Sequence, residues 1–324
     1  MQTISEFDRQ FGTNEQCRAF LAQLRWPDGV RCPRCGNKDK VYALAARPFH
    51  WVCKSGAEVV DKQSGEVTTC HKRNGYRFSV ITRTIFQDTK IALNLWFKVG
   101  YLMLTSKKGI SALQIHRVIF GEKSTHDYHT SWFMCMRWRA AMAGDMYQSL
   151  KGEVEVDETY IGGKDSNRHW KNKSRQRRIA ANAGPFDPKV GYGKIGVIGA
   201  IERKGNVVAR VIGSMDAPTL ASFVRRATDE KVSLVVTDEN PGYRHIGKGI
   251  KHEAVNHSRG EYVRGNIHTN SIESFWSLLK RGIVGTYHNV SKEYLPFYLN
   301  EFSFRFNNRD NGAMFADLIT TCSQ

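Results

Sequence analysis

The sequence lacks any apolar run long enough to cross a bilayer, and it is poor in cysteine. Its most lipid-like segment, residues 91–104, contains Asn94 and Lys98, whereas a membrane-spanning helix needs about 20 apolar residues. Residues 1–12 carry charged side chains and no continuous apolar segment, which argues against a signal peptide. The 7 cysteines are too sparse and unevenly placed for a disulfide scaffold. We therefore expect a cytoplasmic protein with no membrane partner.

Acidic residues are in the minority as well. The chain has 48 Lys and Arg against 31 Asp and Glu, which gives a formal charge of +17. A field of this sign attracts polyanions, so nucleic acid is the leading partner class, and a basic protein without such a partner is the alternative. Basic and aromatic residues are interleaved in three segments, as expected of surfaces that follow a phosphate backbone: residues 73–83, 132–139 and 168–178.

The pattern of apolar residues changes along the chain and predicts a modular protein, with no internal repeat or low-complexity tract. Residues 1–29 read as a helical lead-in, in which Thr13 and Gln16 are placed to form a capping box. Residues 30–87 alternate short β-like runs with turn residues and carry four of the cysteines. Residues 88–145 have helical periodicity that indicates a helix-turn-helix region. The last predicted domain spans residues 146–324.

This last domain alternates strands with helices, which predicts a mixed α/β layer architecture. We expect a hairpin turn at residues 203–206, whose sequence is RKGN. The predicted strands are residues 154–161, 194–201, 207–212 and 233–237, and the predicted helices are residues 217–227 and a segment that begins at 271.

The cysteines of residues 30–87 have the spacing of a zinc site. Cys32 and Cys35 form a knuckle that can hold one Zn²⁺ from the same side, and Cys53 and Cys70 are the natural second pair. Because 16 residues separate Cys53 from Cys70, where a compact ribbon has about two, we expect an inserted loop between them. His71 is the alternative fourth ligand. The other cysteines are expected to be buried thiols: Cys17, Cys135 and Cys322.

Three acids lie where an α/β sheet places its ligands. Asp157 lies inside the first predicted strand, where burying a carboxylate is costly without a partner or a metal. Asp238 follows the strand at residues 233–237, and Glu273 borders the apolar face of the next helix. Carboxylates suit Mg²⁺, and paired divalent cations drive phosphoryl transfer on DNA. Taken singly, each acid also has an ordinary explanation: a salt bridge, a turn former and a first-turn helix acid.

The residue pattern alone leaves other acids in competition with these three. Glu153 and Glu155 share a strand face with Asp157, because side chains alternate along a strand. Glu158 and Glu239 are direct neighbours of two of the candidates. Spacing therefore does not decide which carboxylates would hold a cation.

At these residues the chain resembles bacterial insertion-sequence transposases that have an N-terminal zinc ribbon and a DDE domain, a group related to the Merlin elements of eukaryotes. The resemblance covers most of the chain, and its most specific part is residues 268–282. It rests on CPRC at residues 32–35, VDETYIGG at 156–163, TDE at 237–239 with Tyr243, HTNSIESFW at 268–276 and EFSFR at 301–305. The interval between Cys53 and Cys70 departs from the group's usual close second knuckle.

The resemblance implies an RNase H-like catalytic fold and assigns the DDE triad to Asp157, Asp238 and Glu273. It implies that Mg²⁺ (or Mn²⁺) supports cutting at the ends of a mobile element, after which the freed 3′-hydroxyl attacks target DNA. Double-stranded DNA, from the element ends and the target, is the implied partner, and we expect a homo-oligomer on that DNA. The helical segment at residues 107–139 would read the terminal repeat, and basic residues 164–178 would grip a strand near Asp157.

Two alternatives follow from the same residues. In the first, the zinc ribbon and helix-turn-helix make a DNA-binding regulator whose RNase H-like domain is catalytically inactive. In the second, the protein is a nuclease of the same fold that cuts DNA and never joins it. The presence of all three acids favours the transposase over the regulator, and only the reaction products separate the transposase from the nuclease.

Overall fold

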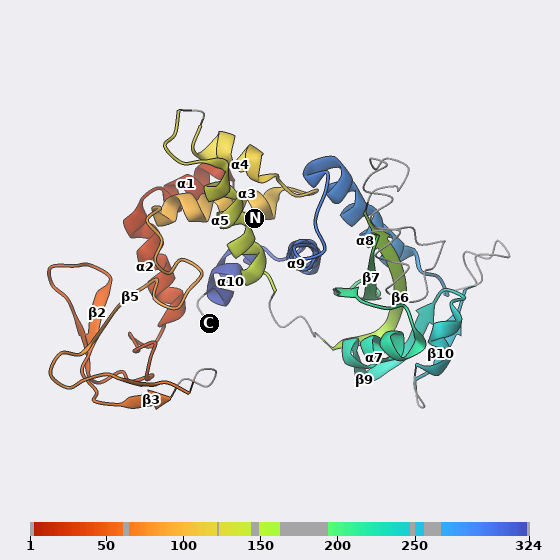
Figure 1. Cartoon of the computed structure of the whole chain (residues 1–324), viewed down its shortest axis with the longest axis horizontal. Helices are drawn as coiled ribbons and strands as arrows, with labels where there is room; N and C mark the ends of the chain where they lie inside the picture. The colour runs from red at the N-terminus through yellow and green to blue at the C-terminus, as the bar shows by residue number, and fades with distance from the viewer. Residues whose placement is uncertain are drawn as a thin grey trace, which may run out of the picture. The chain divides into compact units, whose positions relative to one another are not determined.

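The structure is a computed structural model that describes residues 3–60, 65–121, 123–143, 149–162, 194–246, 250–255 and 267–322. The basic segment at residues 164–178 lies outside these described residues. Among the described residues, no helix is long and apolar enough to cross a membrane. The chain divides into two compact units, drawn in Figure 1 and treated separately below. Unit 1 comprises Met1–Thr105, Ala112–Met142 and Asn311–Gln324, and unit 2 comprises Ser106–Ser111 and Ala143–Asp310.

Unit 1 begins with two helices, α1 (Ile4–Phe11) and α2 (Asn14–Arg25). Each starts with a capping box, in which a threonine and a side chain three residues later bond each other's backbone N–H. In α2 these are Thr13 and Gln16, so the predicted capping box is confirmed. The boxes explain why the chain can end one helix and begin the next within a few residues.

A bundle of further helices completes the helical part of unit 1. These are α3 (Leu93–Thr105), α4 (Ala112–Ile119), α5 (Tyr128–Ala141) and α10 (Met314–Thr321). Aromatic rings fill the core, where Phe97 lies with its ring centroid 5.4 Å from that of Phe11 and 5.5 Å from that of Phe315. Trp138 and Arg139 are buried because α5 packs on α3. The surface expected at residues 132–139 is therefore partly core, which corrects that prediction.

The small β module of unit 1 forms where short β-like runs were predicted. Strands β1 (Val41–Ala43), β2 (His50–Cys53) and β5 (Tyr76–Ser79) make an antiparallel sheet in the order β1-β2-β5. Strands β3 (Glu58–Val60) and β4 (Val67–Thr69) form a separate hairpin. The core of this module is small, so a further constraint is needed to stabilise it.

Unit 2 is built on a five-stranded sheet in the order β10-β9-β6-β7-β8. Strands β6, β7 and β8 are antiparallel neighbours, whereas β9 and β10 run parallel to β6. The predicted turn at residues 203–206 joins β7 to β8, which confirms the hairpin. The strands are β6 (Leu150–Ile161), β7 (Ile195–Glu202), β8 (Val207–Ile212), β9 (Thr228–Thr237) and β10 (His252–Ala254).

Helices of unit 2 pack on the two faces of this sheet. On one face, Val154 and Val156 belong to the core cluster that includes apolar residues of α7 (Ala217–Ala227). On the other face, α8 (Asn270–Gly282) packs on β6 and β7. The alternation of side chains along β6 therefore directs Asp157 to the α8 face. The other helical segments that the structure describes in unit 2 are η2 (Pro241–His245), a π-helical turn at Ile283–Tyr287, and α9 (Leu295–Asn307), which packs on β8.

Candidate functional site

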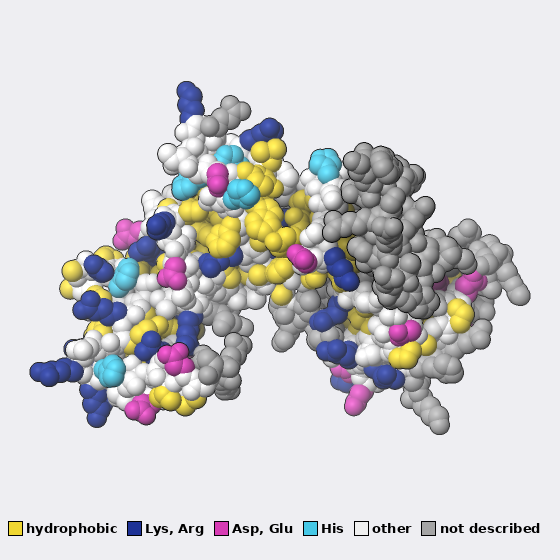
Figure 2. All heavy atoms as spheres, in the orientation of Figure 1, with side chains coloured by type: hydrophobic (Ala, Val, Ile, Leu, Met, Phe, Trp, Pro, Cys, Tyr) yellow, Lys and Arg dark blue, Asp and Glu magenta, His cyan; other side chains and the backbone are white. Residues whose placement is uncertain are grey.

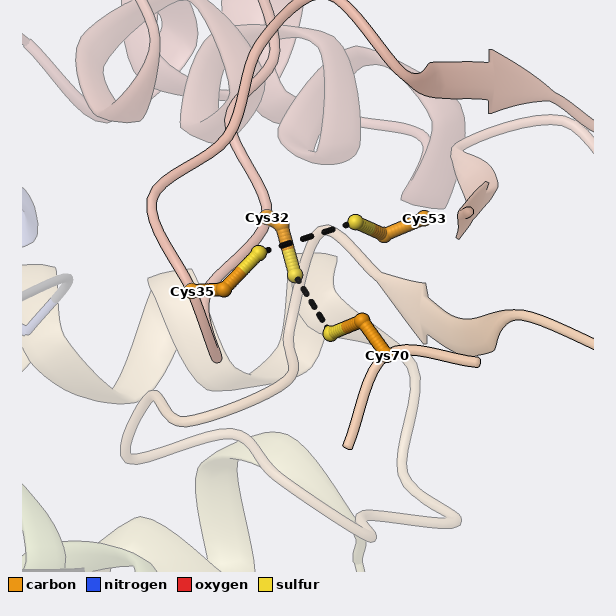
Figure 3. Close-up of side chains that lie close together, drawn as sticks. All are labelled: Cys32, Cys35, Cys53 and Cys70. Atoms are coloured by element: carbon orange, nitrogen blue, oxygen red, sulfur yellow. Dashed lines mark hydrogen bonds between the residues drawn. The ribbon is translucent and has the colours of Figure 1, made fainter. Parts of the chain in front are cut away.

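The structure brings the four predicted zinc ligands together. Sγ of Cys32 lies 3.8 Å from Sγ of Cys70, and Sγ of Cys35 lies 3.7 Å from Sγ of Cys53 (Figure 3). A tetrahedral Zn²⁺ with Zn–S bonds of about 2.3 Å has S–S edges of about 3.8 Å. All four sulfur atoms lie within 4.8 Å of one another. The spacing and the thiolate chemistry of this group both fit one structural Zn²⁺.

The long interval before Cys70 is occupied by the β3–β4 hairpin. Backbone bonds from Gly56 N to Cys70 O (2.6 Å) and from Cys70 N to Ala57 O (2.9 Å) close the base of this hairpin. The two ends of the insertion therefore meet, and Cys70 lies near Cys53 as a close knuckle would place it. Exposed His71 is not part of the cysteine group.

Zinc loss is the expected result of replacing Cys70 by serine. Structural Zn²⁺ contributes an apparent binding free energy of about 10–16 kcal/mol in small domains, so the β1-β2-β5 sheet should unfold with the metal. Zinc content by plasma mass spectrometry and the circular dichroism of the chain measure the two effects. His71→Ala and Cys17→Ser are the controls, because each lies outside the cysteine group. Zinc retained by Cys70→Ser and lost by His71→Ala would make His71 the ligand.

A second cluster lies where β9 ends beside β6. In the parallel register Glu155 pairs with Val236, and β9 ends at Thr237. Asp238 follows immediately, so it leaves the sheet beside Asp157 of β6. The carboxylates of Asp157, Glu158 and Asp238 each place an oxygen within 4.8 Å of the others.

Glu158 reaches this cluster from the opposite face of the strand. As the neighbour of Asp157 it points toward the α7 face, but β9 no longer covers the edge of β6 at this level. Asn240 Nδ2 donates a hydrogen bond of 2.9 Å to Glu158 Oε1. The side chain of Glu158 is thereby held at the sheet edge, where the two faces meet.

The carboxylates in this cluster repel one another. Burial, with the charges of Asp238 and Glu273, raises the pKa of Asp157 to about 6. Burial, with the charges of Asp238 and Asp157, raises the pKa of Glu158 to about 7. Because nearby negative charges disfavour ionisation, a divalent cation would relieve this repulsion, and carboxylate oxygens are the ligands that Mg²⁺ prefers.

Glu273 does not belong to the group of three, although it lies on the helix beside it. Thr269 Oγ1 donates a hydrogen bond of 2.9 Å to Glu273 Oε1 in the first turn of α8. One turn later, Trp276 Nε1 donates to Asp157 Oδ2 at 3.1 Å. Gly199, the register partner of Asp157, leaves room for this indole, because a Cβ there would lie 2.6 Å from the ring.

Glu155 is not in the carboxylate cluster, although it was a competitor on sequence grounds. Its fully buried carboxylate accepts hydrogen bonds from Ser271 N (2.8 Å), Ser271 Oγ (3.0 Å) and Ile272 N (3.1 Å). Arg203 Nε donates to it at 3.1 Å, and His268 Nδ1 lies 3.3 Å away. Glu155 therefore caps the N-terminus of α8 from the neighbouring strand.

Sequence reasoning left Glu158 as one of several competing acids, and it did not identify two contacts: the Trp276 bond to Asp157 and the capping by Glu155. The partners of Glu155 lie 48 and 116 residues away, so no local pattern reports them. The motif at residues 268–276 contains Trp276, but a sequence motif does not predict that the indole N–H binds the carboxylate of Asp157.

Comparison with known proteins finds matches to both parts of the chain. A family model described as a transposase zinc-ribbon domain matches residues 12–55, and one described as an ISXO2-like transposase domain matches residues 149–307. A Halobacterium salinarum protein, described as an uncharacterized protein in transposable element ISH50, is 26% identical over 302 residues, which are 92% of each chain. The chain therefore belongs to the insertion-sequence transposases that combine an N-terminal zinc ribbon with an ISXO2-like transposase domain.

Proposed function

We propose that this transposase cuts DNA at the ends of its element and joins them to target DNA through Asp157, Asp238 and Glu273. The observation that carries the proposal is the meeting of Asp157 and Asp238 at the sheet edge where β9 ends. The five-stranded sheet, with three antiparallel strands followed by two parallel ones, supports assigning unit 2 to the RNase H-like folds.

In this proposal Asp157 and Asp238 hold Mg²⁺ or Mn²⁺, and Glu273 on α8 completes the set. The negative charge of Glu273 already contributes to the raised pKa of Asp157, which supports its place beside the pair. When bound, the cations supply the means to activate an attacking oxygen and to stabilise a leaving one. All the proposed ligands are carboxylates, a donor set that suits these hard cations.

The surrounding side chains orient these ligands. Trp276 donates a hydrogen bond to Oδ2 of Asp157, which restrains the orientation of that carboxylate. Asp238 Oδ1 accepts a hydrogen bond of 3.1 Å from Asn240 N, which fixes the turn after β9. Asn240 also donates to Glu158, so one residue positions two members of the cluster.

The remaining parts would bind the substrate. We assign α4 and α5, which pack against each other in unit 1, to a helix-turn-helix that reads the terminal repeat of the element. Duplex DNA from the element ends and the target would be the partner, and the protein would act as a homo-oligomer on that DNA. The domain boundaries at residues 29, 87 and 145 belong to the same proposal.

The test uses purified protein and a DNA fragment that spans the genomic copy of the element with its flanks. With Mg²⁺, we expect nicks at the element ends followed by joining to a target plasmid. With Ca²⁺, which favours a looser coordination than Mg²⁺, we expect DNA binding without products. Sequencing of the joined ends measures the reaction.

The reaction products also separate the alternatives. Nicked DNA that is never joined would indicate a nuclease of the same fold. Binding with neither product would indicate a regulator, and either result would overturn the proposed function.

A further inference from the structure

A basic hollow lies on the β module of unit 1. Its volume is about 820 Å³, and its lining includes Arg34, Lys54, His71, Arg73, Tyr76 and Arg77. None of its lining residues is acidic. Figure 2 shows several Lys and Arg side chains on the visible face of this module. We call this site the ribbon hollow.

Three of the lining side chains are direct sequence neighbours of the zinc ligands, so the zinc site fixes their positions. Arg34 lies between the knuckle cysteines, Lys54 follows Cys53 directly, and His71 follows Cys70 directly. The backbone that carries these three side chains is therefore fixed wherever the sulfur atoms are fixed. Gathering like charges is unfavourable unless a counter-charge is bound, so the arrangement points to an anionic ligand.

Arg34 is held in place before any ligand arrives. Its guanidinium carbon lies 3.7 Å from the centroid of the Tyr76 ring. Its Nη1 donates a hydrogen bond of 3.1 Å to the carbonyl oxygen of Thr69 in β4. A guanidinium stacked on a ring and anchored through one nitrogen still has further N–H groups to donate, and ordering it in advance lowers the entropic cost of binding.

The inserted hairpin helps to build the hollow. Thr68 and Thr69 of β4 line it, and the matched zinc-ribbon family model ends at residue 55, before this hairpin. Gly75, also in the lining, has a φ of +70°, and a Cβ there would lie 2.3 Å from Cγ2 of Val52. The turn that carries Arg73 can therefore approach β2 only because residue 75 is glycine.

We propose that the ribbon hollow binds the phosphate backbone of double-stranded DNA, independently of sequence. Arg73 and Arg77 are exposed and would contact phosphate oxygens, and Arg34 would donate to a phosphate from its fixed position. Such contacts position a protein on a duplex and carry no base information. The inference rests on the proposed function only in taking DNA as the ligand.

The test measures duplex binding by full-length protein at several salt concentrations without added Mg²⁺, so that cutting plays no part. Each phosphate contact adds about one unit to the slope of log K against log salt. We expect the double variant Arg73→Ala, Arg77→Ala to reduce the slope by about two units and to weaken binding roughly tenfold or more. The loss should be the same for two duplexes of unrelated sequence. Arg73→Lys with Arg77→Lys should keep most of the slope, because it keeps the charge.

Lys38→Ala with Arg47→Ala is the matched control, because both side chains are exposed on the same module and neither lines the hollow. Zinc content is measured for every variant. A second measurement uses the unaltered chain: bound duplex should protect Lys54 from acetylation and leave Lys38 reactive. An unchanged slope, an equal loss in the control variant, or Lys54 that stays reactive on DNA would overturn the proposal. Asp157→Asn protein should bind with the unaltered slope, so a failure of catalysis is distinguishable.

Discussion

Asp157→Asn is expected to abolish nicking and joining together, by roughly 10³-fold or more, because one catalytic carboxylate becomes a neutral amide. The substitution keeps the volume of the side chain and an oxygen that can accept the bond from Trp276 Nε1. It removes the charge that would hold a divalent cation beside Asp238. Single-turnover nicking and joining at saturating protein measure the loss, and duplex affinity should stay within about threefold of the unaltered protein, because the variant removes no cationic group.

Glu230→Gln is the matched control for this prediction. Glu230 is an exposed acid on β9, the strand that leads to Asp238, and its loss should leave the reaction unchanged. Joining by Asp157→Asn at the unaltered rate would refute the proposed site.

Two variants test which acid, Glu273 or Glu158, is the third catalytic carboxylate. Glu273→Gln should lose as much activity as Asp157→Asn. Glu158→Gln should slow the reaction less, because Asn240 already satisfies part of that carboxylate. The reverse order of effects would place Glu158 in the triad, in agreement with its position in the cluster of three.

The zinc module shows what spacing can predict. The knuckle at Cys32 and Cys35 and its partner Cys53 follow from short local patterns, and the structure places their sulfur atoms together with that of Cys70. The hairpin inside the Cys53–Cys70 interval was not predictable in detail. Strands β3 and β4 are three residues each and contain no buried residue, so no apolar alternation marks them.

The carboxylate cluster shows where local pattern fails. Strand alternation correctly separates Glu158 from Asp157 by face, yet the two carboxylates meet because β9 stops at Thr237. The residue at which β9 ends is far from Glu158 in the sequence, so the residues around Glu158 do not predict it. Strand β10 was missed for a similar reason, since it is three residues long and is defined by its pairing with β9.

Glu155 lies on the same face of β6 as Asp157, but its carboxylate is bound by distant partners in the sequence, and these partners make a second large effect testable. Glu155→Ala should destabilise the packing of α8 in unit 2 by about 3–5 kcal/mol, the cost of breaking a buried ion pair by removing one partner. The substitution leaves Nε of Arg203 and the N–H groups of Ser271 and Ile272 without their acceptor. Hydrogen exchange of these two amides measures the free energy of local opening.

Glu153→Ala is the matched control, because Glu153 also pairs with Arg203 but its side chain is 37% exposed, whereas that of Glu155 is 0% exposed. An exposed pair contributes about 0–1 kcal/mol, so Glu153→Ala should leave exchange at Ser271 and Ile272 nearly unchanged. Because α8 carries Glu273 and Trp276, Glu155→Ala should also raise the Mg²⁺ concentration needed for half-maximal nicking. Equal exchange in the two variants would show that α8 is held by its apolar face, through residues such as Phe275, and not by the buried carboxylate.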